Sequence, residues 1–167
     1  LLRFGDIPSL IIFTSRKTKV REITRALQKE GFNAKGISSD LEQVEREDML
    51  REFKNKQLPI IVATDVISRG IDVDNIDMII NYDVPGDAAD YVHRIGRTAR
   101  AESEGEAVTF INEDDQENFQ KIEELIEAVV RKVPMPAHLG DGPEYDPKKF
   151  AGRGKRSYGG KKNFKKR

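Results

Sequence analysis

A cluster of basic residues past the middle of the chain carries the clearest chemical signal in this sequence. Residues 93–100 read His-Arg-Ile-Gly-Arg-Thr-Ala-Arg, so three arginines and a histidine fall within eight positions. On a helix, positions 93, 97 and 100 would lie on one face. A guanidinium is planar, stays charged and holds a phosphate through two hydrogen bonds at once. The spacing therefore favours a site for a polyanion such as a nucleoside triphosphate, although an isolated Arg-x-x-Arg is more often a solvent-exposed basic helix.

A second candidate site, residues 63–73, directly follows a short apolar run. That run, residues 59–63, has the composition of a buried parallel strand. Ligands of open α/β sheets bind just outside the carboxyl ends of the strands, which is where Thr64 and Gly70 would lie. Gly70 would let the backbone approach a ligand closely. Asp72 is placed to accept hydrogen bonds from hydroxyl groups such as those of a ribose.

Together, the two segments resemble motifs V and VI of the DEAD-box RNA helicases, a branch of helicase superfamily 2. The usual motif V reads Ala-Thr-Asp-x-x-Ala-Arg-Gly-Ile-Asp, and Ser68 replaces its second Ala here. The usual motif VI reads His-Arg-Ile-Gly-Arg-Thr-Gly-Arg, and Ala99 replaces its second Gly. Residues 10–15, Leu-Ile-Ile-Phe-Thr-Ser, look like motif IV, and residues 43–46, Gln-Val-Glu-Arg, look like the Gln-x-x-Arg motif. All four occur in the family's order, and the chain resembles the C-terminal RecA-like domain of a bacterial-type member.

The resemblance implies a nucleotide role for four residues. Arg97 and Arg100 would reach the γ-phosphate of ATP across a domain interface. Arg100 would be the arginine finger, which stabilises the charge on the transferring phosphoryl group. Asp72 would contact the ribose, and Gly70 would approach the nucleotide.

The resemblance also implies RNA and interdomain contacts. Arg46 and Thr64 would hold RNA phosphates, helped by Gln43, and such contacts give affinity without sequence choice. His93 and Arg94 would link motif VI to the first helicase domain and to motif V; the alternative for Arg94 is a salt bridge within its own helix. Backbone contacts alone do not distinguish RNA from DNA, so a DNA-directed motor of the same superfamily stays an open alternative.

Two motifs of the family are missing from this sequence. It has no Gly-x-x-x-x-Gly-Lys-Ser/Thr loop to cradle phosphates, and no Asp-Glu-Ala-Asp sequence to hold Mg²⁺ and position the attacking water. The family carries both on its first, N-terminal RecA-like domain, which would bind most of the ATP with its Mg²⁺. We therefore expect a fragment of an ATP-dependent RNA helicase, an RNA-stimulated ATPase that is inactive without the first domain of the same protein. RNA and that domain are its expected partners.

Composition narrows the class further. The 167 residues include no cysteine, which excludes disulfides, thiolate metal sites and cysteine nucleophiles. Two histidines are too few for a convincing metal cluster. No apolar run approaches the ~20 residues that span a bilayer. We expect no membrane partner and a cytoplasmic location.

Strand-like apolar runs alternate with helical patterns along the chain. We expect strands at residues 9–14, 33–37, 57–63, 78–82 and 107–111, and helices at 17–30, 41–54, 87–95 and 114–132. The last helix should bury Phe119, Ile122, Leu125, Ile126 and Val129. This order predicts an α/β fold, a mostly parallel sheet with helices on both faces, as in the three-layer RecA-like domain that the resemblance implies. A receiver-type signalling domain shares this plan but should have an Asp after an early strand, where this chain has Thr14 and Ser15.

The chain divides into a RecA-like domain at residues 1–133, a linker at 134–147 and a basic tail at 148–167. Residues 147–167 hold ten Lys and Arg and no acid, which leaves 19 basic and 29 acidic residues in the rest of the chain. The tail buries too little apolar surface to offset its ordering entropy, so we expect disorder. Its basic residues alternate with aromatic ones, a pattern that favours sequence-tolerant RNA binding; the alternative is a solubilising tail. A non-enzymatic RNA-binding module would use the tail and Arg46 alone, but the arginine spacing of residues 93–100 argues against it.

Overall fold

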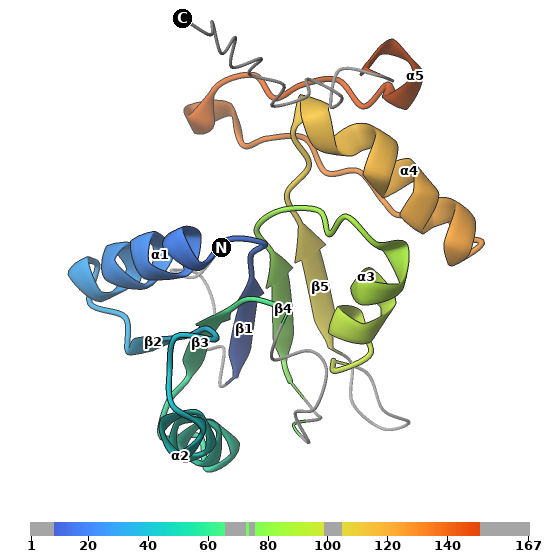
Figure 1. Cartoon of the computed structure of the whole chain (residues 1–167). Coiled ribbons are helices and arrows are strands. Elements are labelled where there is room, and N and C mark those ends of the chain that lie inside the picture. The colour runs from blue at the N-terminus through green and yellow to red at the C-terminus, as the bar shows by residue number, and fades with distance from the viewer. Residues whose placement is uncertain (1–8, 66–72, 74–75, 99–104, 151–167) are drawn as a thin grey trace, which may run out of the picture.

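A five-stranded, fully parallel sheet forms the centre of the molecule (Figure 1). The computed structural model describes residues 9–65, 73, 76–98 and 105–150. The strands lie in the order β2-β3-β1-β4-β5. Their bounds are Leu10–Phe13 for β1, Ala34–Ile37 for β2, Ile60–Ala63 for β3, Met78–Asn81 for β4 and Glu106–Thr109 for β5. All five predicted strands are present, each shorter than expected.

Helices cover both faces of this sheet, as the alternation of apolar runs predicts. Their bounds are Lys17–Lys29 for α1, Gln43–Lys54 for α2, Ala88–Ile95 for α3, Gln116–Leu125 for α4 and Pro147–Phe150 for α5. Short 3₁₀ helices lie at Glu113–Asp115 (η1) and Ala137–Leu139 (η2). None of these helices is long and apolar enough to cross a membrane, a finding that covers the described residues only.

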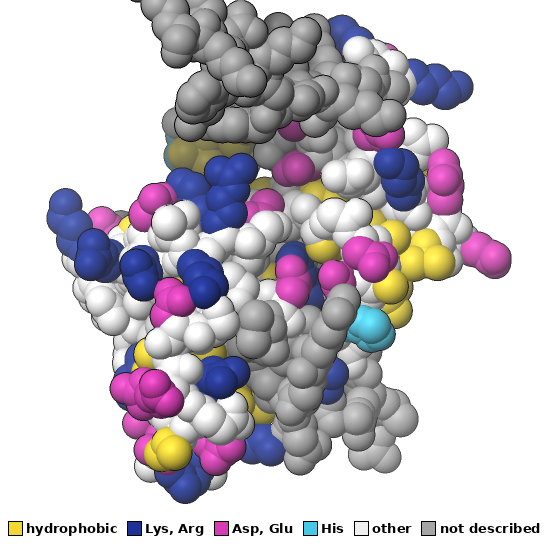
Figure 2. Space-filling model, viewed as in Figure 1, with side chains coloured by type: hydrophobic (Ala, Val, Ile, Leu, Met, Phe, Trp, Pro, Cys, Tyr) yellow, Lys and Arg dark blue, Asp and Glu magenta, His cyan; other side chains and the backbone are white. Residues whose placement is uncertain are grey.

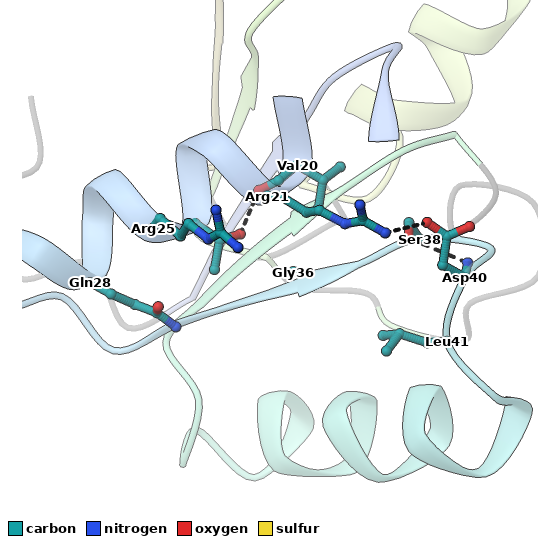
Figure 3. A pocket seen from close by; sticks show the side chains of 9 residues that line it. Val20, Arg21, Arg25, Gln28, Gly36, Ser38, Asp40 and Leu41 are labelled. Carbon is teal, nitrogen blue, oxygen red and sulfur yellow. Dashed lines mark hydrogen bonds and ion pairs between the residues drawn. The ribbon is translucent and has the colours of Figure 1, made fainter. Parts of the chain in front are cut away.

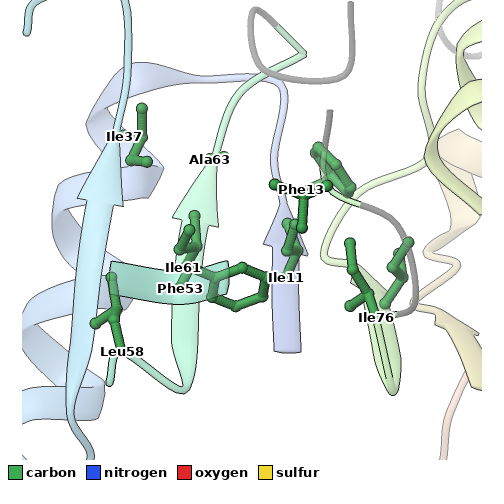
Figure 4. Packing of buried hydrophobic residues seen from close by; sticks show 10 residues of the cluster. Ile11, Phe13, Ile37, Phe53, Leu58, Ile61, Ala63 and Ile76 are labelled. Atoms are coloured by element: carbon green, nitrogen blue, oxygen red, sulfur yellow. The ribbon is translucent and has the colours of Figure 1, made fainter. Parts of the chain in front are cut away.

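Alternation along the central strand β1 explains the two cores. Successive side chains of a strand point to opposite faces. Ile11 and Phe13 therefore pack in one cluster with Phe53 of α2 (Figure 4), while Ile12 packs in a second cluster with Val20 of α1. The three-layer RecA-like prediction is confirmed by this arrangement.

The C-terminal part differs from the sequence prediction. Helix α4 ends at Leu125, not near residue 132, and Glu127 has a φ of 53°, which a continuing helix does not allow. Phe119 is buried as expected, but Leu125 is 53% exposed and Val129 is 89% exposed, so the expected burial of these two residues is wrong. The apolar periodicity continues past Leu125, but the helix does not.

Residues after α4 fold back onto it. Glu123 of α4 accepts hydrogen bonds from Lys132 Nζ at 2.6 Å, from the Val130 N–H at 2.7 Å and from Tyr145 Oη at 2.8 Å. The Tyr145 ring packs edge-to-face on Phe119, with 6.2 Å between the centroids. The segment that the sequence predicts as a linker thus contacts the domain through Tyr145. Of the predicted tail, residues 151–167 lie outside the described residues.

Candidate functional site

The topology brings several polar residues to one edge of the sheet. Strand β1 lies between β3 and β4, so the chain places β2 and β3 on one side of β1 and then crosses to β4 and β5 on the other. Ligands of such sheets bind outside the carboxyl ends of the strands, at the point where the strand order reverses. Thr14 follows β1, Thr64 follows β3 and Asp83 lies just after β4. The sheet register therefore places these three residues along the same edge.

Arg94 joins the ends of three strands. It lies in α3 and is fully buried, and its Nε and Nη2 donate to the two carboxylate oxygens of Asp65 at 2.6 and 2.8 Å. Its Nη1 donates to Asn81 Oδ1 at 3.0 Å and to the Asp83 carbonyl at 3.3 Å. The guanidinium also stands 5.2 Å from the centre of the Phe13 ring. Arg94 thus pairs with the segment after β3 rather than with another residue of its own helix.

Asp83 belongs to neither of the sequence motifs, yet it lies at the same edge of the sheet. Its carboxylate accepts hydrogen bonds from Thr14 Oγ1 at 2.8 Å, from the Ser15 N–H at 2.9 Å and from Ser15 Oγ at 2.6 Å. These bonds tie the end of β4 to the end of β1. A polar residue directly after a buried strand is the signal that would have identified it, and Thr14 carries the same signal.

Two of the three residues assigned to RNA have unused hydrogen-bonding atoms. The Thr64 hydroxyl and the Arg46 Nε are buried and have no hydrogen-bond partner among the described residues. Thr64 as a whole is 6% exposed. Unpartnered buried polar atoms are rare in proteins, and each needs an explanation such as a bound group. Gln43 is exposed, and its side chain instead donates to Glu47 Oε1 at 2.6 Å.

The nucleotide residues are only partly described. Helix α3 ends at Ile95, and Arg97 lies in the turn after it, so the expectation that residues 93, 97 and 100 share one helical face is wrong for Arg97. The Arg97 carbonyl accepts from the Ile76 N–H at 3.2 Å, just before β4. That contact places the Arg97 backbone near the opposite end of β4 from Asp83. His93 is exposed, with its Nδ1 4.0 Å from an Asp90 oxygen.

Three further predicted site residues, Gly70, Asp72 and Arg100, lie outside the described residues. Of the four residues assigned to the nucleotide, the structure thus describes Arg97 alone. Within the described part of the chain, no group of three or more His, Cys, Asp or Glu side chains is arranged to hold a metal ion.

A groove of about 410 Å³ lies between α1 and the segment after β2 (Figure 3). Its lining includes Arg21 and Arg25 on the helix and Ser38 and Asp40 on the segment. Asp40 accepts hydrogen bonds from Lys17 Nζ at 2.7 Å and from Arg21 Nη2 at 3.0 Å, and the bond from Lys17 is the main reason why the pKa of Asp40 is lowered. Lys and Arg side chains gather over this side of the molecule (Figure 2). None of the predicted site residues lines this groove.

Comparison with known proteins identifies the same class. Residues 2–102 match the helicase conserved C-terminal domain family. The chain is 42% identical over 142 residues to the ATP-dependent RNA helicase DeaD of Haemophilus influenzae, a match that covers 83% of this chain and 23% of that protein. The chain spans only 23% to 34% of the length of the curated relatives that it matches.

Solved structures agree with this match. The C-terminal domain of the DEAD-box protein Dbp5 superposes with a TM-score of 0.72 at 29% identity, covering 77% of this chain and 76% of that one. A second structure, S. cerevisiae Dbp5 L327V bound to RNA and ADP BeF3, gives a TM-score of 0.67 at 30% identity over 73% of this chain and 33% of that one.

Proposed function

Since the chain belongs to the helicase conserved C-terminal domain family, in its DEAD-box branch, we propose that it works as the second RecA-like domain of an ATP-dependent RNA helicase. It would supply the arginine finger and part of the RNA- and ATP-binding clefts for local unwinding of an RNA duplex. The chain spans only 23% to 34% of the length of the curated relatives that it matches, and the first RecA-like domain is its proposed partner. Without that domain we expect no ATP hydrolysis.

The observation that carries the RNA half of the proposal is the pair of unused polar atoms on Thr64 and Arg46. A phosphate oxygen accepts hydrogen bonds from a hydroxyl and from a guanidinium N–H. Both residues were assigned to RNA from the sequence alone, and each keeps a donor that no described protein group uses. Gln43 would join them by exchanging its bond with Glu47 for one to the RNA.

Arg94 would support this site from behind. Its four hydrogen bonds hold Asp65, the neighbour of Thr64, against the end of β4. The position of the Thr64 hydroxyl therefore depends on a side chain that is fully buried. His93, which is exposed on the same helix, is the better candidate for direct contact with the first domain.

On the nucleotide side, Gly70, Asp72, Arg97 and Arg100 would bind ATP. ATP, with Mg²⁺ held mainly by the first domain, supplies the phosphoryl group whose transfer to water drives the cycle. Asp72 would orient the ribose. Arg97 and Arg100 would bind the γ-phosphate, with Arg100 stabilising the charge that spreads over its oxygens during transfer.

The test uses the full-length helicase with its first domain present. Arg100→Ala should lower ATP turnover by ~10³-fold or more while RNA binding without nucleotide barely changes. Arg46→Ala should instead weaken RNA binding on every sequence. Arg51→Ala is the matched control, because Arg51 lies on the same helix as Arg46 but is exposed and paired with Asp48.

Four results would contradict parts of the proposal. Turnover of the Arg100→Ala protein within a few-fold of wild type would refute the finger assignment, and equal effects of Arg46→Ala and Arg51→Ala would refute the RNA contact. Steady hydrolysis by the isolated, pure chain above a buffer blank would refute its dependence on the first domain. Unwinding of a DNA duplex as fast as an RNA duplex of the same sequence would favour the DNA motor instead.

A further inference from the structure

An aromatic groove of about 690 Å³ lies beyond the ends of β4 and β5. Tyr82 and Phe110 form part of it and contact each other edge-to-face, with 6.1 Å between the ring centroids. They are 39% and 44% exposed, and Met135, on the C-terminal segment, is 45% exposed. Three large apolar side chains thus line one open groove. Such a grouping on a surface marks a place where another segment binds.

The rim of the aromatic groove is acidic. Glu113 and Asp141 line it, and no Lys or Arg is among the described lining residues. Glu113 begins η1, whose three residues are all acidic. Burial, together with repulsion from the nearby Asp83 and Asp114 carboxylates, raises the pKa of Asp115. Burial is the main cause of this shift, and the two neighbouring carboxylates add to it. The groove therefore favours a partner that is both cationic and aromatic.

The C-terminal segment of this chain starts beside that rim. Gln116, one residue after η1, is 1% exposed, and its amide binds the Glu144 carbonyl at 2.8 Å and the Asp146 N–H at 2.7 Å. These two bonds fix the chain directly before α5 next to the acidic η1. The 17 residues from 151 to 167 then follow. At ~3.3 Å per residue they reach up to ~55 Å, which is ample for a return to the groove.

We propose that residues 151–167 bind the aromatic groove of their own chain. They carry eight Lys and Arg and no acid, with aromatic side chains at Tyr158 and Phe164. The basic groups match the acidic rim and can also stack on the Tyr82 and Phe110 rings. A short tether gives an effective concentration of ~1 mM. If the same segment, as a free peptide, bound the groove with a dissociation constant of ~1 mM, the tethered segment would occupy the groove about half of the time. The proposal does not depend on the helicase function.

The test places a spin label on the segment in the intact chain. The sequence has no cysteine, so Asn163→Cys gives a unique attachment site. At low ionic strength the label should broaden the amide signals of residues 110–113 and 141–142 to half their intensity or less. Those signals should recover in 1 M salt, where the Debye length is ~3 Å. Lys29→Cys, on the exposed surface of α1, is the control label and should leave these residues sharp.

A double variant, Glu113→Lys with Asp141→Lys, separates specific binding from chance contact. Both side chains are exposed, so the fold should survive, which unchanged amide shifts in the sheet would verify. In this variant the broadening should fall at least several-fold. Absence of broadening in the parent chain, broadening that persists in the double variant, or broadening of other surfaces to the same degree overturns the proposal. A mixture of spin-labelled chains without isotopes and unlabelled, isotope-enriched chains tests for binding between copies. Equal broadening in that mixture also overturns the proposal, because the occupant of the groove would then be a second copy of the chain.

Discussion

Replacing Arg94 by lysine should destabilise the domain strongly although it keeps the charge. The Arg94 guanidinium makes four hydrogen bonds, two to Asp65, one to Asn81 and one to the Asp83 carbonyl. A lysine has a single nitrogen and cannot form the planar double contact with Asp65 while it also reaches β4. At least two acceptors, the buried Asn81 Oδ1 and a half-buried oxygen of Asp65 or Asp83, would lose their donor, at ~1–3 kcal/mol each. We expect a loss of ~3 kcal/mol for Arg94→Lys and about 3–5 kcal/mol for Arg94→Ala.

Urea unfolding followed by far-UV circular dichroism measures this loss, since the chain has no tryptophan for fluorescence. For a domain of this size ~1 kcal/mol corresponds to about 2–4 °C in Tm, so the Arg94→Lys variant should melt about 6–12 °C lower. Arg51→Lys is the control. Arg51 is 69% exposed and pairs only along its own helix with Asp48, so its change should stay within about 0.5 kcal/mol.

The result that would refute this reasoning is a specific one. If Arg94→Lys unfolds within about 0.5 kcal/mol of wild type, as expected of the Arg51→Lys control, then the hydrogen bonds across the strand ends contribute little. The proposed support of Thr64 by Arg94 would fall with it. A destabilised but folded Arg94→Lys protein should in addition show weaker RNA binding in the full-length helicase, since Asp65 adjoins Thr64.

Three further predictions concern other parts of the chain. Tyr145→Phe should lower the free energy of unfolding by ~1–2 kcal/mol at pH 7 by removing a hydrogen bond to ionised Glu123. Burial alone would raise the pKa of the Glu123 carboxyl, but the hydrogen bonds that it accepts from Lys132, Tyr145 and Val130 lower this pKa below its usual 4.5. The stabilisation that the Tyr145 bond provides is therefore complete above pH 4.5, and it is lost as the pH falls through the lower pKa of the folded state. Urea titrations of both proteins from pH 7 to pH 3 should therefore show their difference shrinking, and a constant difference would argue against the ionised bond. Gly36→Ala should lower the free energy of unfolding by ~1–3 kcal/mol in the same assay, because an added Cβ would lie 2.9 Å from Thr24 Oγ1 and from Val20 Cγ1. Gly86→Ala is the control, because its added Cβ meets no atom within 4 Å and should leave the stability nearly unchanged. Equal effects of the two substitutions would refute the packing argument. Removing residues 148–167 from the full-length helicase should weaken RNA binding and reduce the slope of log affinity against log salt by about 3, and equal slopes would leave the segment a solubilising tail.

Local signals in the sequence determined the positions of the strands and of the first three helices, and they identified the family. Each strand is a short run of apolar residues, and each of the first three helices shows an apolar face with a 3.6-residue period, both of which are properties of neighbouring residues. Gly31, with a φ of 87°, follows Glu30, the residue that caps α1, and glycine tolerates that conformation. Motifs V and VI are each one unbroken stretch of sequence, so they too can be read from the sequence, and the resemblance that they carry implies the proposed RNA role of Thr64 and Arg46.

The tertiary structure alone decided what depends on residues that are distant in sequence. Arg94 belongs to a basic motif whose composition is typical of an exposed surface, yet it is fully buried. It can be buried because Asp65, Asn81 and Asp83, which are distant from it in sequence, accept its hydrogen bonds where the strands end. The periodic apolar pattern after Leu125 predicts more helix, but the chain turns there, and Tyr145, which is distant in sequence, packs edge-to-face on Phe119. A buried position is filled by whichever segment packs there best, and a sequence read in short windows does not contain that competition.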